Sequence, residues 1–122
     1  MSKENINLGR TGEETAVVLL KENGYKILKR NYKTRFSEID IIARDKDTIC
    51  FVEVKTRFSD RFGAPLESIT LAKQKKIYRS ALCFLKENNF FDHKARFDVV
   101  AITFRDKKAQ SELIKNAFEL DY

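Results

Sequence analysis

The sequence is short of the residues that break or cross-link a chain. Its 122 residues include one proline, four glycines, two cysteines, one histidine and no tryptophan. Because no stretch is rich in proline, glycine or serine, no linker separates two domains, and we expect residues 1–122 to form a single domain. Two cysteines and one histidine argue against a disulfide framework and against a structural zinc site.

Long apolar runs are also missing. The longest run is far shorter than the ~20 residues needed to cross a bilayer, and the chain does not open with the basic, apolar and small-residue segments of a signal peptide. We therefore expect a cytoplasmic protein with no membrane-spanning segment.

Positive charge is in excess. Lysine and arginine number 24 against 18 aspartates and glutamates, which gives a net charge of +6 and a pI of about 9.4. This balance favours a polyanionic partner such as nucleic acid or an anionic membrane surface. An ordinary soluble basic protein would have the same charge, so the composition alone does not choose between these alternatives.

Helix and strand patterns alternate along the chain. They predict helices over about 11–23, beginning there or somewhat earlier, and 70–86, with strands over 25–32, 38–43, 49–57, 96–104 and 111–115 and a loop over 57–68. The side of the second helix expected to be buried carries Leu71, Tyr78, Ala81, Leu82 and Leu85. The order predicts an α/β fold in which a central mixed sheet is flanked by helices.

The stretch FVEVKTR at residues 51–57 places charge inside a strand that otherwise suits a core. Because alternate side chains of a strand share a face, Glu53, Lys55 and Arg57 lie on the face that begins with Ile49 and Phe51. Taken alone, Glu-x-Lys favours an exposed strand face, because so short a motif is common in half-solvated sheets.

Asp40 and Glu13 change this interpretation. Asp40 interrupts the apolar strand Ile39–Ile42, where an unpaired acid is costly to bury, and a hairpin between the second and third strands would bring it close to Glu53. Glu13 shares its helical face with apolar residues and therefore points toward the protein. We assign its neighbour Glu14 to a capping box with Thr11.

Three carboxylates near one ammonium group make a site for a hard divalent cation. Glu13, Asp40 and Glu53 are the predicted ligands, and oxygen donors of this kind suit Mg²⁺ or Mn²⁺. Such a cation holds a scissile phosphate and lowers the pKa of a bound water. Lys55 is predicted to orient that water or to stabilise the charge of the transition state. The predicted catalytic residues are therefore Lys55, Asp40, Glu53 and Glu13.

These residues resemble a known pattern. Asp40, followed by Glu53-Val54-Lys55 and preceded by a helical Glu13, is similar to the Asp…(Asp/Glu)-x-Lys pattern of restriction-endonuclease-like nucleases, the PD-(D/E)XK superfamily. More closely, and along almost its whole length, the chain resembles the YraN-like family of small bacterial proteins regarded as endonucleases. The stretches that carry this resemblance are GRTGEETAVVLL, SEIDIIARD, FVEVKTR, FGAPLESITLAKQKK and RFDVVAI. Archaeal Holliday junction resolvases are similar in size and in this core.

The resemblance implies a restriction-endonuclease-like core and Mg²⁺-dependent hydrolysis of phosphodiester bonds, with DNA, including branched or junction DNA, as substrate. By analogy with the resolvases it also implies a homodimer. The chain departs from the family at Ser37, where glycine is common before Glu-Ile-Asp; this concerns the local turn and leaves the acid in place.

The second helix adds basic residues and a further resemblance. Gln74 to Tyr78 resemble the Gln-x-x-x-Tyr motif of RecB-type nucleases. This resemblance implies that Gln74 and Lys73 lie near the metal site or the scissile phosphate. A basic helix with Tyr78 in the core and Gln74 in solvent explains the same letters. The residues predicted to contact nucleic acid are Arg35, Arg57, Lys73, Gln74 and Lys76. No motif that reads a groove is visible, so these contacts would recognise phosphates and the shape of the nucleic acid.

Two other functions remain open at this level. A non-catalytic nucleic-acid-binding module of the same fold would bind in a salt-sensitive way but would not turn over substrate. A basic adaptor that binds protein would show no salt-sensitive affinity for DNA or RNA. The intact set of Glu13, Asp40, Glu53 and Lys55 favours the nuclease.

Overall fold

A computed structural model describes residues 3–58 and 69–119, with side chains from residue 12 onward. The elements follow in the order α1 (Lys3–Glu22), β1 (Lys26–Lys33), β2 (Glu38–Asp45), β3 (Thr48–Phe58), α2 (Leu71–Glu87), β4 (Lys94–Arg105) and β5 (Lys108–Phe118). This order confirms the predicted α/β fold. The predicted loop over 57–68 lies outside the described residues after Phe58, and its first two residues belong to β3.

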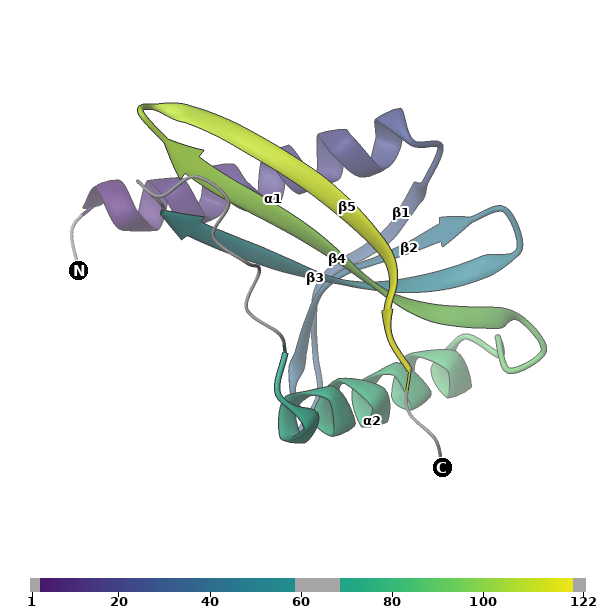
Figure 1. Ribbon diagram of the computed structural model, residues 1–122. Coiled ribbons are helices and arrows are strands. Elements are labelled where there is room, and N and C mark those ends of the chain that lie inside the picture. The colour runs from purple at the N-terminus through teal and green to yellow at the C-terminus, as the bar shows by residue number, and fades with distance from the viewer. Residues whose placement is uncertain (1–2, 59–68, 120–122) are drawn as a thin grey trace.

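The five strands form one mixed sheet in the order β1-β2-β3-β4-β5 (Figure 1). β3 and β4 are parallel, with α2 in the connection between them, and the other neighbours are antiparallel. This sheet with two helices is consistent with a restriction-endonuclease-like core. Neither helix, over the residues described, is both long enough and apolar enough to cross a membrane.

The two helices cover opposite faces of the sheet (Figure 1). On the α2 side, Ile49 and Phe51 of β3 pack with Phe84. On the α1 side, Cys50 and Val52 belong to a buried cluster with residues of α1 that include Leu20. The alternation predicted for this strand is thus present, and its central half is buried on both faces.

Helix α1 ends as predicted and begins earlier than its predicted cap. Gly24 has a φ of +86° and donates to the carbonyl of Lys21 at 3.0 Å, in the left-handed conformation that ends many helices. Because the helix already starts at Lys3, Thr11 lies inside it, and the capping box assigned to Thr11 and Glu14 is wrong. Glu14 instead accepts a hydrogen bond from Arg30 Nη2 at 2.8 Å.

The buried face of α2 matches the predicted one in part, because Ala81 and Leu85 are buried and Tyr78 packs partly buried against the core. Leu71 and Leu82 are 59% and 38% exposed, and the side chains that face the sheet are Ile77, Ser80, Ala81, Phe84 and Leu85. Ser80 is fully buried because its hydroxyl lies 2.7 Å from the hydroxyls of both Thr34 and Ser37.

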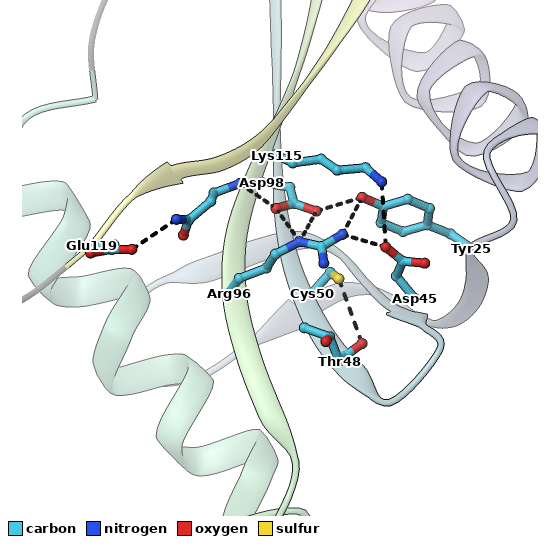
Figure 2. Close-up of polar contacts among 9 residues, drawn as sticks. Tyr25, Asp45, Thr48, Cys50, Arg96, Asp98, Lys115 and Glu119 are labelled. Carbon is cyan, nitrogen blue, oxygen red and sulfur yellow. Dashed lines mark hydrogen bonds and ion pairs between the residues drawn. The ribbon is translucent and has the colours of Figure 1, made fainter.

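A buried carboxylate anchors the end of the sheet at which β3 and β4 begin (Figure 2). Asp98 is fully buried, and its Oδ1 accepts hydrogen bonds from Arg96 Nε at 3.0 Å and from the backbone N–H of Asn116 at 2.9 Å. Its Oδ2 accepts from the hydroxyl of Tyr25 at 2.8 Å. These donors offset the cost of removing a charge from water.

Arg96 extends these contacts to the end of β2. Its Nη2 donates to the Tyr25 hydroxyl and to Asp45 Oδ2, both at 2.7 Å. The hydrogen bond from Arg96 is the main reason that the pKa of Asp45 is lowered from its ordinary value of 3.8. Lys115 of β5 also lies 3.6 Å from Asp45. The cluster therefore joins β2, β4 and β5 to the residue that follows α1 (Figure 2).

We expect Tyr25→Phe to lower the free energy of unfolding by about 1–3 kcal/mol, because it removes a hydrogen bond to a fully buried carboxylate. Tyr32→Phe is the matched control: the Tyr32 hydroxyl donates to Glu87 at 2.9 Å, and Glu87 is exposed, so water can replace the lost donor. Urea denaturation followed by circular dichroism measures both. Equal losses in the two variants would contradict an anchoring role for Asp98.

Candidate metal-binding and catalytic site

The candidate site lies where β2 and β3 separate. Their antiparallel pairing ends at Ile41 and Val52, whereas β3 continues to pair with β4 as far as Phe58. Residues 38–40 of β2 and 53–58 of β3 therefore form a fork. In Figure 1 the start of β2 turns toward α2, while the end of β3 runs away from it.

Asp40 lies inside the fork. Its Oδ2 accepts a hydrogen bond from the backbone N–H of Val54 at 2.8 Å, in place of a further bond between the strands. Burial is the largest cause that raises the pKa of Asp40 from its ordinary 3.8 to about 7, and the neighbouring carboxylates of Glu53, Glu13 and Glu38 raise it further, against the bond from Val54. Near neutral pH this carboxyl group is held between its two protonation states.

Glu53 is the most buried acid of the fork, with 8% of its surface exposed. Its Oε1 accepts a hydrogen bond from Lys73 Nζ at 2.9 Å. Its Oε2 is buried and has no hydrogen-bond partner in the described part of the chain. One oxygen of this carboxylate is therefore paired with an ammonium group. The other is an unsatisfied buried acceptor, which a donor or a cation would stabilise.

Lys73 reaches Glu53 because of the way α2 begins. Thr70 is the N-cap residue, and its hydroxyl accepts from the backbone N–H of Lys73 at 3.2 Å. The positive end of the helix thus also faces the region of Glu53, and no acid occupies its first turn. The resemblance to the RecB-type motif implies a position for Lys73 near the predicted metal site, and Lys73 does contact Glu53, one of the predicted ligands. Its predicted contact with nucleic acid stays a prediction.

Lys55 and Arg57 follow Glu53 on the same side of β3. Lys55 is half-buried and makes no ion pair with any residue that the structure describes. Arg57 donates from Nε to the hydroxyl of Thr103 at 3.4 Å, across the parallel pair with β4. Lys55 is therefore a cation two residues from the buried Glu53, and no described carboxylate forms an ion pair with it.

Glu13 approaches the fork from α1. A side chain at Gly12 would place its Cβ only 2.5 Å from the Thr56 hydroxyl, so this glycine lets α1 lie directly on β3. Glu13 contributes to the raised pKa of Asp40, but its Oε2 also lies 3.9 Å from Arg30 Nη2. Over the described residues no three His, Cys, Asp or Glu side chains are gathered as a ready-made metal centre.

The other residues predicted to contact nucleic acid are distributed along α2 and the turn before β2. Gln74 donates from Nε2 to the carbonyl of Ile69 at 2.8 Å and so holds the segment that leads into α2. Lys76 is exposed. Arg35 lies over the ring of Phe36, with Cζ 4.9 Å from the ring centre.

The arrangement offers two hard oxygen ligands. Asp40 and Glu53 meet at the fork from adjacent strands, and both are acids whose surroundings favour a gain of positive charge. Glu13 is near enough to affect Asp40 electrostatically. These two carboxylates could hold a small cation, with the Lys55 side chain two residues from Glu53 along β3.

Comparison with known proteins places the chain among bacterial relatives. A profile of the uncharacterised protein family UPF0102 matches residues 12–102. UPF0102 proteins of Geobacter metallireducens and Syntrophus aciditrophicus are 50% and 48% identical, covering 100% and 98% of this chain and 100% and 94% of their own lengths. A UPF0102 protein of Clostridium acetobutylicum is 39% identical over 98% of this chain and all of its own.

We expect Asp40→Asn to stabilise the protein at pH 8 when divalent cations are absent. Between pH 4 and 7 the folded state keeps a proton on Asp40 that the unfolded state has lost, so the stability of the wild type falls as pH rises through this window. Asparagine can still accept the bond from Val54 but has no charge, and it should raise the free energy of unfolding at pH 8 by on the order of 2 kcal/mol.

Urea denaturation in EDTA from pH 4 to pH 8 measures this effect. Asp47→Asn, at an exposed turn residue, is the control. If Asp40→Asn and the wild type lose stability in parallel over this window, the raised pKa of Asp40 is wrong.

Proposed function

The chain belongs to the uncharacterised protein family UPF0102. From the residues of the fork we propose that it is a metal-dependent nuclease that hydrolyses phosphodiester bonds in nucleic acid. The substrate that we propose is DNA, selected by its structure, as in branched or junction DNA. The observation that carries the proposal is the fork itself. Among the residues that the structure describes, one buried oxygen of Glu53 has no partner, the neighbouring Asp40 has a raised pKa, and Lys55 pairs with no carboxylate.

The fork fits a hard divalent cation. Asp40 and Glu53 would hold it through carboxylate oxygens, and Glu13 would contribute directly or through water. The partnerless Glu53 Oε2 and the repulsion between the acids are both relieved by a positive charge at this position. Bound there, Mg²⁺ or Mn²⁺ would supply Lewis-acid stabilisation of a phosphate and lower the pKa of a coordinated water.

The side chains of the fork have separate tasks in this proposal. Lys55 orients the attacking water and stabilises the negative charge that develops on the phosphate. Lys73 pairs with Glu53 in this structure and would be free to contact the substrate if a cation took its place. Arg57, Lys76 and Arg35 contact phosphates, which gives affinity that falls steeply with salt.

The resemblance to restriction-endonuclease-like nucleases supports the same proposal. The chain has the acid, the acid-x-lysine and the helical acid of that pattern, and its mixed sheet is consistent with that core. The second candidate is a nucleic-acid-binding module without catalysis. It is favoured by Glu13, which lies close to Arg30 instead of completing a three-acid cluster with Asp40 and Glu53.

We expect Lys55→Ala to lower the single-turnover rate of cleavage by about 100-fold or more, as removal of one group that stabilises transition-state charge does. The assay uses labelled duplex, single-stranded, flap, four-way-junction and RNA substrates in Mg²⁺ and in Mn²⁺. Folding and most of the affinity for nucleic acid should be retained. The control is Lys94→Ala, an exposed lysine at the opposite end of the β3–β4 pair.

Cleavage by Lys55→Ala at the wild-type rate would exclude the proposed role of this lysine. If no substrate is cut although salt-sensitive binding persists, the second candidate replaces the nuclease.

We expect Lys73→Met to make the thermal stability more dependent on Mn²⁺. In EDTA the variant leaves the buried Glu53 without its cationic partner, at a cost of about 1–2 kcal/mol because Lys73 is itself partly exposed. Mn²⁺ would restore the missing charge and should therefore raise the melting temperature of this variant more than that of the wild type.

Differential scanning calorimetry of the wild type, Lys73→Met and Lys76→Met, in EDTA and in Mn²⁺, tests this. Lys76 is also an exposed lysine on α2, one turn further along, and serves as the control. An equal shift with Mn²⁺ in all three proteins would show that Lys73 and the cation do not share Glu53.

A further inference from the structure

An open groove lies between α2 and the turns on either side of it. Its volume is about 640 Å³, and its lining consists of Phe36, Arg79, Leu82, Cys83, Lys86 and Phe91. The phenylalanines come from the turn before β2 and the turn after α2, and the other residues lie on α2. Phe91 is 59% exposed, a large apolar area for a side chain that no described element covers.

The charges around the groove select its occupant. The lining residues that the structure describes include two cations, Arg79 and Lys86, and no carboxylate. The guanidinium groups of Arg35 and Arg79 lie over the Phe36 ring, with Cζ 4.9 and 5.7 Å from its centre. An apolar protein partner would leave these cations unmatched. A nucleotide would match both features, because its base has a face that stacks on aromatic and guanidinium groups and its phosphate is an anion.

The groove and the fork both involve α2, at different points along its length. Lys73 contacts Glu53 at the fork, and the next turn is held to the start of β2, where Ser37 donates to the carbonyl of Lys76 at 3.2 Å. Arg79, the first α2 residue of the lining, follows Lys73 by six residues, so the groove begins about 9 Å along the helix axis from Lys73. A single strand with one phosphate at the fork can reach the groove within a few nucleotides.

We propose that this groove binds an unpaired base of a single-stranded segment next to the bond that is cut. The base stacks on Phe91, and Arg79 and Lys86 contact the adjoining phosphates. The inference rests on the proposed nuclease function and deepens it, because it names the feature that marks the substrate: a strand with unpaired bases, as at a flap, a gap or the branch point of a junction.

The thiol of Cys83 allows occupancy of the groove to be measured by alkylation of the wild-type protein. It is half-buried in the groove lining, while the chain's other cysteine, Cys50, is fully buried and its pKa is raised by burial to about 12. Alkylation by iodoacetamide should therefore label Cys83 and spare Cys50. Mass spectrometry follows the rate in EDTA, where no cleavage takes place, with oligothymidylate or with a blunt duplex of equal length. Fluorescence anisotropy measures the binding of each ligand separately.

We expect oligothymidylate at about ten times its Kd to slow alkylation of Cys83 by about tenfold, as occupancy of the groove requires. The blunt duplex, which offers no unpaired base in its interior, should protect Cys83 much less. Phe91→Ala should lose the protection and weaken binding of oligothymidylate, with the duplex unaffected. Phe58→Ala is the matched control, because Phe58 is likewise 59% exposed and stacks on Phe104 away from the groove.

Each other result overturns the inference in a recognisable way. If oligothymidylate binds without protecting Cys83, or if Phe91→Ala and Phe58→Ala behave alike, the groove is not a base site and the nuclease proposal is unaffected. If the duplex protects Cys83 as strongly, the groove does not select unpaired bases. If neither nucleic acid binds, the proposed function itself fails, and the groove inference fails with it.

Discussion

β3 is paired unequally along its two edges, and the candidate site depends on this asymmetry. Toward β4 its pairing runs from Thr48 to Phe58, but toward β2 it stops at Val52. Beyond that point the backbone of β3 has one free edge, and the side chain of Asp40 satisfies the first amide there, that of Val54. The separation of the strands opens the space in which Asp40 and Glu53 meet, and it lets Lys73 of α2 reach Glu53 from the other side.

The fork is a place of unfavourable electrostatics within a well-packed domain. Two acids share a region with little water, one of them with a raised pKa and the other with a partnerless oxygen. Lys73 relieves part of this repulsion. At the other end of the sheet the contacts of Asp98 with Tyr25 and Arg96 are fully satisfied and fasten the strands together. Strain at a site that is supported by a stable scaffold elsewhere is typical of functional centres.

Local features of the sequence were sufficient for the order of elements and for much of the fork. The two-residue period of β3 correctly separates Glu53 from Val52 and Val54, and Asp40 stands out because an acid interrupts an apolar strand. The capping box predicted from Thr11 and Glu14 is wrong, because Thr-x-x-Glu also occurs within a helix. The roles of Glu13, Asp40, Glu53 and Lys55 in catalysis stay predictions.

Long-range contacts account for what the sequence did not disclose. The apolar spacing of α2 correctly included Ala81 and Leu85 but missed Ser80, which is buried with its hydroxyl in contact with two hydroxyl groups from the turn before β2. Asp98 lies in a run that reads as plain core, and its partners are distant in the sequence. The ion pair of Lys73 with Glu53 depends on the packing of α2 against β3, and the RecB-type resemblance implied only a position near the site. Each of these three features depends on contacts with residues that are distant in the sequence, and the periodicity of one segment does not reveal such contacts.

The central claim is that the fork is built to hold a divalent cation. Titration of the purified protein with Mn²⁺ at neutral pH, with free Mn²⁺ followed by electron paramagnetic resonance, tests it without reference to any substrate. The account predicts saturable binding by the wild type and loss of that binding in Glu53→Gln, which keeps the shape of the side chain and removes its charge. Saturable binding that is unchanged in Glu53→Gln, or no binding by the wild type, would contradict the account.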